Sequence, residues 1–264
     1  MTTTFERATA VRRIADGAYD VELDPAYSIG GPLHGGYLMA TLLRAMLADA
    51  PHPHPVSNNF HFLRVPRPGP ARAHVEWLKQ GRTAATARAT LVQDDRPVLE
   101  GLVSAGTLDP VAEPVWMGEP PALPPLDECV PPPATPDGAP AGLAAQMELR
   151  HDPATAGWLR GEPAGRPEMR GYLRMREPQD PDPYVLALAT DALPPAVFGI
   201  GLLGWAPTVE LTWHMRAVPA PGWLRLAMAA RMVYDDWFDE DVEVWDSAGR
   251  LVAQGRQMAR VGRS

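Results

Sequence analysis

The sequence predicts an α+β protein with two similar halves, each containing one buried helix followed by a run of antiparallel strands. Apolar segments of helical length lie at Tyr37–Leu47 and at Tyr184–Leu193, and each precedes a series of strand-like patterns. Short motifs also recur in the same order in the two halves. One long buried helix followed by a run of antiparallel strands in each half suggests two fused copies of one α+β module.

The first half begins with a hairpin pattern. Alternating residues from Ala10 to Leu23 surround an Asp16-Gly17 turn. The segment 30–36 (GGPLHGG) precedes the first helix, where glycines allow a ligand to approach unpaired N–H groups. Further strands are expected at 58–64, 71–80, 83–93 and 96–108.

The second half places polar residues around its helix. One carboxylate, Asp191, interrupts the apolar helix predicted at 184–193. Residues 208–216 (TVELTWHMR) alternate as in a strand and begin with Thr208. Two strand patterns follow, and the last predicted strand, 250–261, carries Gln257. Asp, Thr and Gln on three elements around one helix are typical of a functional site.

The two halves share internal motifs. Residues 61–66 (HFLRVP) match 214–219 (HMRAVP), and 96–101 (RPVLEG) match 250–255 (RLVAQG). Proline is dense between the halves, so regular structure is not expected there. We predict an N-terminal domain at 1–108, a proline-rich linker at 109–147 and a C-terminal domain at 148–264 that carries the candidate site.

Composition limits the function classes. The chain has 24 basic and 32 acidic residues and a formal charge of −8, so net charge does not favour nucleic acid or an anionic membrane surface. Cys129 is the only cysteine, which excludes a disulfide framework within the chain and fits a reducing compartment. No apolar stretch approaches the roughly 18 residues of a membrane span. We expect a soluble cytoplasmic protein.

These motifs together resemble the acyl-CoA thioesterase II family, whose fold is a double hotdog of two fused helix-in-sheet modules. In that family an Asp on the second helix, a Thr on the next strand and a Gln in the final strand hold a hydrolytic water. Asp191 in 189–195 (ATDALPP), Thr208 at the start of its strand, and Gln257 after 249–253 (GRLVA) match these positions. The departures are a shorter connection between Asp191 and Thr208 and the density of proline in the linker.

The resemblance implies hydrolysis of acyl-CoA thioesters by a water held by Asp191, Thr208 and Gln257. A carboxylate in an apolar environment has a raised pKa and is a better base. Backbone N–H groups at His34, Gly35 and Gly36, in the glycine-rich start of the first helix, are candidate donors to the thioester carbonyl. No metal or other cofactor is expected, since coenzyme A is part of the substrate.

Several residues have both a structural and a functional interpretation. Glu210 shares the face of Thr208 if the strand is regular, and it is either a structural acid or a second carboxylate in the pocket. His61 and His214 occupy repeat-equivalent positions and are interpreted as structural. The acidic run 235–241 (DDWFDED) is interpreted as a solvated edge or turn with its aromatic residues turned inward.

Other functions are weighed against hydrolysis. A non-catalytic acyl-thioester-binding protein is compatible with the sequence. An enoyl-thioester hydratase of this fold is expected to carry D-x-N-P-x-H, whereas residues 29–34 (IGGPLH) lack the Asp and Asn. Residues 199–204 (GIGLLG) satisfy GxGxxG but follow prolines rather than a strand, and there is no GxSxG motif.

We also expect one active site per chain and a homo-oligomer, most simply a dimer, that contacts the acyl-CoA substrate but no nucleic acid or membrane. At the first-half positions that correspond to Asp191, Thr208 and Gln257, no base, hydroxyl or amide is present. These positions hold Arg44, Pro55 and Val103.

Overall fold

The computed structural model describes residues 2–132 and 141–262, and its main element is one large antiparallel sheet. In the first half the strands are β1 Val11–Ala15, β2 Ala18–Leu23, β3 His54–Phe62, β4 Gly69–Gln80, β5 Ala84–Gln93 and β6 Arg96–Gly106. In the second half they are β7 Met147–His151, β8 Glu168–Met175, β9 Thr208–Met215, β10 Leu224–Ala229, β11 Val233–Tyr234, β12 Trp237–Trp245 and β13 Leu251–Arg260. The α-helices are α1 Thr4–Ala8, α2 Gly35–Ala48, α3 Leu143–Gln146 and α4 Pro183–Ala189, and the 3₁₀ helices are η1 Pro25–Tyr27, η2 Leu126–Glu128, η3 Gly157–Arg160 and η4 Ala196–Ile200.

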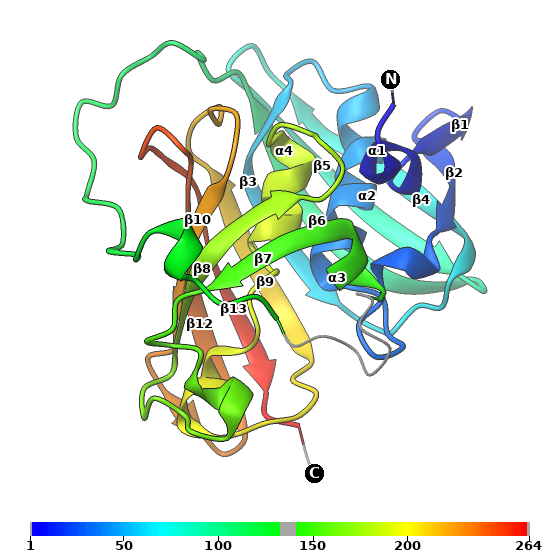
Figure 1. Ribbon diagram of the computed structural model, residues 1–264. Helices are drawn as coiled ribbons and strands as arrows, with labels where there is room; N and C mark the ends of the chain where they lie inside the picture. Colours follow the sequence, from blue (N-terminus) through cyan, green and yellow to red (C-terminus); the bar gives the residue numbers. More distant parts are fainter. Residues whose placement is uncertain (1, 133–140, 263–264) are drawn as a thin grey trace.

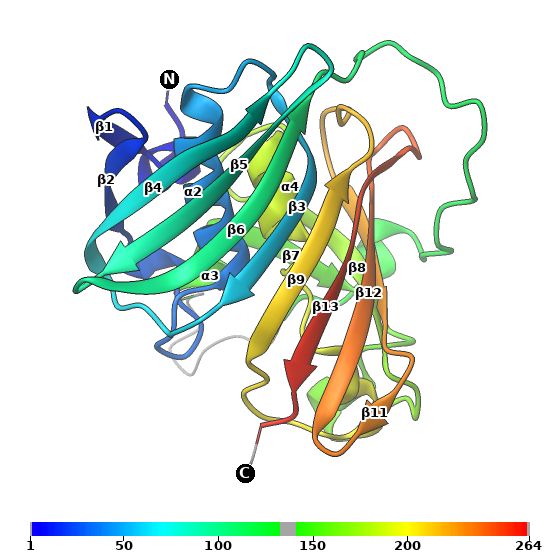
Figure 2. The same ribbon diagram turned by 180° about the vertical axis from the view of Figure 1, so that it is seen from behind.

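The strand order divides the sheet at the pairing of β3 with β9. It runs β1-β2-β4-β5-β6-β3-β9-β13-β12-β10-β8-β7, with β11 paired to β12 at the side. Helices α2 and α4 lie side by side on the inner face of the sheet, each against the strands of its own half (Figure 1). Viewed from the other side, the strands of the two halves meet along β3 and β9 (Figure 2). The predicted arrangement of one helix and one run of antiparallel strands per half is therefore present.

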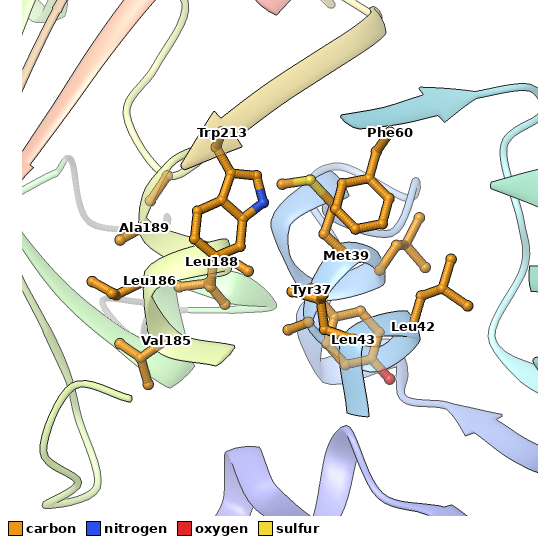
Figure 3. Close-up of a cluster of buried hydrophobic side chains, with 14 of the residues drawn as sticks. Tyr37, Met39, Leu42, Leu43, Phe60, Val185, Leu186, Leu188, Ala189 and Trp213 are labelled. Atoms are coloured by element: carbon orange, nitrogen blue, oxygen red, sulfur yellow. The ribbon is translucent and has the colours of Figure 1, made fainter. Parts of the chain in front are cut away.

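The core lies where the two helices face the central strands. Phe60 from β3 and Trp213 from β9 are both fully buried. Figure 3 shows Phe60 beside Met39 of α2 and Trp213 beside Leu188 of α4. Large buried aromatic side chains of this kind contribute about 1.5–3 kcal/mol each by burial, so they fix each helix against the central strand of its own half.

The two central strands carry a β-bulge at the same repeat position. In β3 the register with β6 shifts between Pro55 and Ser57, which leaves Val56 as the extra residue. In β9 the register with β13 shifts so that Ala259 pairs with Thr208 and Met258 with Glu210. Because a bulge bends a strand and changes the direction of the next side chains, both halves alter the strand start in the same way.

Helix α4 ends earlier than the sequence predicts. It spans Pro183–Ala189, with Asp182 as N-cap and Pro183 at its first position, whereas a helix was expected to continue to Leu193. The Thr190 hydroxyl donates to the carbonyl of Ala187 at 2.9 Å and closes the last turn. Pro194 disfavours helical geometry at the residue before it. Asp191 therefore lies in a turn beyond the helix rather than inside it.

The connection between the halves is largely irregular up to Met147. Residues 107–125 contain no helix or strand, η2 follows, and residues 133–140 of the predicted linker lie outside the described residues, as do Met1 and 263–264. Helix α3 and the first residue of β7 fall within the predicted linker range 109–147. Strands β7 and β8 were not predicted. Among the described residues, no helix is long and apolar enough to cross a membrane.

Candidate active site

A cavity of about 1030 Å³ lies between the start of α2 and the strands of the second half. Its lining includes apolar side chains from both halves, among them Leu38, Phe62, Leu143, Met147, Leu193, Phe198 and Phe238. Polar side chains gather in the same cavity: His34, Asp191, Thr208, Glu240 and Gln257. The residues predicted to hold a water are thus brought together from separate elements.

The Asp191 carboxylate packs against the start of α2, with 13% of its side chain exposed. Its Oδ2 accepts a hydrogen bond from the Gly36 N–H at 2.8 Å and lies 3.3 Å from His34 Nε2. Within the described chain, Oδ1 has no hydrogen-bond partner, so one oxygen is held and the other is open. Burial raises the pKa of Asp191, while the neighbouring His34 ring and the Gly36 hydrogen bond act in the opposite direction.

Two glycines allow this close approach. A Cβ atom on Gly35 would lie 2.7 Å from Asp191 Oδ2, and a Cβ atom on Gly36 would lie 2.8 Å from the carbonyl oxygen of Leu188. Both distances are too short for an ordinary contact: a side chain at Gly36 would push against the backbone of α4, and one at Gly35 would displace the Asp191 and Phe62 side chains. The glycine motif before α2 therefore serves the packing of the Asp191 turn.

The N–H groups at the start of α2 are already largely used. The His34 N–H donates to the Tyr27 carbonyl at 2.9 Å, and the Gly36 N–H is held by Asp191. Among the described residues, the Gly35 N–H has no partner, and Gly35 lines the cavity whereas Gly36 does not. Of the predicted donors to a thioester carbonyl, only Gly35 is available; the expectation that His34 and Gly36 offer free N–H groups is wrong.

The His34 side chain connects the two helices. Its Nδ1 accepts a hydrogen bond from the Tyr37 N–H at 3.3 Å, which assigns the ring proton to Nε2. Nε2 then donates to the backbone carbonyl of Asp191 at 2.9 Å. This pair of bonds caps α2 and fixes the turn that carries Asp191.

Three neighbouring strands present a row of polar side chains to the cavity. The Thr208 hydroxyl on β9 donates to Gln257 Oε1 on β13 at 2.7 Å. Gln257 Nε2 in turn donates to Glu240 Oε2 on β12. Gln257 and Glu240 are directly paired across the two strands, so their side chains share one face.

Glu240 is a site residue that the sequence analysis missed. Its side chain is 1% exposed, and its second oxygen, Oε1, accepts a hydrogen bond from the Ala196 N–H at the start of η4. Burial raises the pKa of Glu240 to about 7; the bonds from Ala196 and Gln257 lower it, and the negative charge of Asp191 raises it. Two buried carboxylates with raised pKa values therefore face one cavity.

The interpretation of 235–241 as a solvated edge with inward aromatics is wrong in part. Asp239 and Glu240 are buried, and Trp237 is 39% exposed. Alternation along the strand explains this, because Phe238 and Glu240 point inward while Asp239 pairs with Arg256 on the other face. The available signal was the apolar face of Phe238, Val242 and Val244, with which Glu240 is in step.

Comparison with known proteins identifies the family. Residues 23–106 match the acyl-CoA thioesterase N-terminal domain, and residues 126–261 match the acyl-CoA thioesterase C-terminal domain. The chain belongs to the acyl-CoA thioesterase family. The resemblance inferred from the motifs is thereby confirmed.

Similar chains of the same length support this membership in the thioesterase family. An uncharacterised protein of Mycobacterium tuberculosis (strain ATCC 25618 / H37Rv) is 31% identical over 288 aligned positions, which cover 99% of each chain. A provisionally assigned thioesterase II of Thermobifida fusca YX has a TM-score of 0.92 and 44% identity, over 99% of this chain and 98% of that chain. A protein of unknown function with a hotdog fold from Alicyclobacillus acidocaldarius has a TM-score of 0.87 and 20% identity, over 100% of both chains. The fold of this thioesterase family member is therefore a hotdog fold.

Glu210 lies away from the cavity of this thioesterase family member. It accepts hydrogen bonds from the Asn59 side chain at 2.5 Å and from the Thr212 hydroxyl. Thr208 and Glu210 would share a face only in a regular strand, and the bulge at Val209 inserts one residue between them. Of the two interpretations of Glu210, its contacts support the structural acid. Glu210 joins β9 to β3 on the outer face.

The corresponding positions in the first half are occupied differently. Arg44 donates to the Thr9 hydroxyl at 2.6 Å and lies 3.9 Å from the ring centroid of Tyr184. Pro55 and Val103 are buried in the core. In the described residues, no group of three or more His, Cys, Asp or Glu side chains could hold a metal ion.

Proposed function

We propose that this chain hydrolyses acyl-CoA thioesters to a free acid and coenzyme A, with Asp191 as general base. One observation carries the proposal: Asp191, Thr208 and Gln257 line one cavity, in a chain of the acyl-CoA thioesterase family. We also infer that the sheet consists of two fused hotdog modules, because its strand order separates into two halves at β3 and β9 and each half has its own helix.

In the proposed reaction a water donates one hydrogen to Asp191 Oδ1 and is held by Thr208 and Gln257. The water oxygen attacks the thioester carbonyl carbon as Asp191 takes the proton. The carbon–sulfur bond then breaks, and the proton held by Asp191 returns to the departing thiolate. The products are the carboxylic acid and the free thiol, so atoms and charge balance.

The raised pKa of Asp191 suits this role. A carboxylate with an ordinary pKa is a weak base toward water, whereas burial makes the charged form less stable and more ready to accept a proton. The Gly36 hydrogen bond and His34 keep the ionised form accessible. The position of the carboxylate at the start of α2 has the same effect, because the N-terminal end of a helix favours negative charge.

The thioester carbonyl requires a donor for the negative charge that develops on its oxygen. The Gly35 N–H is the free donor at the start of α2, where the helix dipole adds to its effect. One such donor contributes roughly 10²–10³ in rate. The apolar lining of the cavity supports an acyl chain as the occupant beyond the carbonyl.

A thiol-release assay with acyl-CoA substrates of several chain lengths tests the proposal. We expect release of coenzyme A well above the spontaneous rate for at least one chain length. Binding of acyl-CoA without release of thiol by the purified chain would instead favour a non-catalytic acyl-thioester-binding protein. The enoyl-thioester hydratase is disfavoured, because its expected Asp and Asn are absent at 29–34.

A further inference from the structure

On the basis of the hydrolytic function proposed above, we propose that Glu240 is a positioning residue that sets the direction of the hydrogen-bond chain through Gln257 to Thr208. The direction of this chain decides whether the Thr208 hydroxyl accepts a hydrogen bond from the reacting water or donates one to it. Glu240 thereby acts through two neighbours and does not touch the substrate.

The geometry supports this role because Glu240 has only donors around it. One of its oxygens faces the Ala196 N–H and the other faces the Gln257 amide. No Lys, Arg or His side chain forms an ion pair with Glu240 within the described chain. Burial of a carboxylate with two hydrogen-bond donors and no cation costs free energy. Here its hydrogen bonds continue through Gln257 to Thr208, which lines the cavity.

When Glu240 is ionised, it can only accept hydrogen bonds. The Gln257 NH₂ group must then face Glu240, and the Gln257 carbonyl faces the Thr208 hydroxyl, as observed. The Thr208 hydrogen is used for Gln257, so the Thr208 oxygen is left as an acceptor. A water that donates to both Asp191 and Thr208 keeps an oxygen lone pair for the carbonyl carbon.

When Glu240 is protonated, the direction of the hydrogen bonds through Gln257 to Thr208 reverses. The Ala196 N–H still occupies one oxygen, so the carboxyl proton faces Gln257, whose amide must turn its carbonyl toward Glu240. The Gln257 NH₂ group then donates to the Thr208 oxygen, and the Thr208 hydrogen is free to bond the water oxygen. That bond occupies one of the two lone pairs of the water and withdraws electron density from its oxygen, and the second water hydrogen loses its acceptor, so the reversed arrangement is the less active one.

The charges around Glu240 put this reversal near neutral pH. Asp191 faces it from the turn after α4, and Asp239 is its neighbour on β12; both negative charges raise its pKa, which lies at about 7. Asp239 is itself paired with Arg256, and His34 contacts Asp191. Because Asp191 and Glu240 interact, their two ionisations are expected to be coupled.

The variant Glu240→Gln tests the inference, with Asp239→Asn as the matched control. In the variant, the introduced amide keeps the bond from Ala196 with its carbonyl and turns its NH₂ group toward Gln257, which fixes the reversed chain. We expect kcat at pH 8 to fall roughly 10-fold, the equivalent of about one hydrogen bond, with KM within about 2-fold. The pH profile of kcat should lose one ionisation, and the remaining one should move to lower pH. Asp239→Asn changes a buried carboxylate on the opposite face, so kcat at pH 8 should stay at the parent value. The ionisation should be retained but move to lower pH, because the charge of Asp239 raises the pKa of Glu240.

A double variant separates positioning from simple structural support. In a Thr208→Val background, Glu240→Gln should reduce kcat by less than about 2-fold, since the residue acts through the missing hydroxyl. A parent-like profile in Glu240→Gln, an equal loss in Asp239→Asn, or a full further loss in the Thr208→Val background would each overturn the inference.

Nuclear magnetic resonance gives a readout that does not depend on hydrolysis. The side-chain NH₂ signal of Gln257, assigned by its loss in Gln257→Ala, should shift with pH near neutrality in the parent and in Asp239→Asn, but not in Glu240→Gln. A chain that hydrolyses acyl-CoA without this titration would contradict the role of Glu240 alone. A chain that shows the titration but no hydrolysis would contradict the proposed function and leave the coupling of Glu240 to Gln257 in place.

Discussion

The two halves share a helix and a run of strands, yet the two helix starts are completed in opposite ways. Helix α4 is capped from within its own half by Asp182, whose side chain accepts from the N–H groups of Tyr184 and Val185 at 2.9 and 2.7 Å. Helix α2 receives a carboxylate from the other half, since Asp191 accepts from Gly36. The start of α4 is therefore closed, whereas the start of α2 is open on one side to the cavity.

This difference shows how the two halves of a repeated fold contribute unlike groups to one cavity. The first half contributes its helix start and the Gly35 N–H, and the second half contributes the carboxylate, the hydroxyl and the amide. At the first-half position that corresponds to Asp191, Arg44 packs over Tyr184 and does not line the cavity. A site of this kind needs both halves, although each half alone has the same arrangement of elements.

The largest expected effect on activity comes from replacing Asp191, the carboxylate at the start of α2. Asp191→Asn should lower kcat by roughly 10²-fold or more, because general base catalysis contributes about 10²–10⁴. The control is Asp182→Asn, the same change at the closed start, where Asn remains a good N-cap and activity should be unchanged. Steady-state thiol release measures both variants. An Asp191→Asn enzyme with the parent rate would remove this residue from the mechanism.

The close contact between α2 and α4 at Gly36 should tolerate no Cβ atom. Gly36→Ala puts a Cβ atom 2.8 Å from the Leu188 backbone, which must move because it belongs to the buried helix α4. We expect a loss of about 1–3 kcal/mol in the free energy of unfolding, measured by chemical denaturation. Gly118, which has open space around its Cβ position, provides the control Gly118→Ala. Equal stability of the two variants would contradict the close packing of α2 against α4.

The buried Glu240 should make the free energy of unfolding depend on pH. Folded Glu240 holds its proton up to about pH 7, whereas the unfolded chain releases it near the ordinary value of 4.5. The unfolded state therefore binds fewer protons in this window, so this group's contribution to stability falls as pH rises from about 4.5 to about 7. The difference in unfolding free energy between Glu240→Gln and the parent should change by roughly 2 kcal/mol across the window. A constant difference at pH 5 and pH 8 would count against the buried acid.

The motifs of the second half predicted some of the polar residues that line the cavity. The others could not be predicted because they depend on strand geometry that composition does not show. Asp191 and Gln257 were found because their neighbours follow a family pattern. Glu240 was missed because an acidic run suggests solvent, although alternate residues of a strand face opposite sides. The role of Glu210 stayed open between a structural acid and a pocket carboxylate because a one-residue bulge leaves no clear mark in the sequence.

The role of the first helix start was predicted only in part. Glycines before a helix indicated close approach of a ligand, but they also admit the Asp191 turn. Which N–H groups remain free depends on partners distant in the sequence, such as Tyr27 and Asp191. The early end of α4 likewise depended on a local hydroxyl bond at Thr190 that competes with the helix.

The smallest expected effect concerns association, because an internal pairing of the two halves already completes the cavity. We expect a homo-oligomer, most simply a dimer, at micromolar concentration. Light scattering measures the mass directly, and a species of only 28.6 kDa at that concentration would contradict the expectation. Activity per chain should not depend on dilution if each chain holds a complete site.

The most direct test of a single site built from two halves is the binding stoichiometry of a non-hydrolysable thioether analogue of acyl-CoA. Isothermal titration calorimetry of the parent chain should give one equivalent per chain, and Gly35→Ala should weaken binding because its Cβ atom would press on Asp191 and Phe62. Two equivalents per chain, or one equivalent that is unaffected by changes at both Gly35 and Asp191, would contradict it.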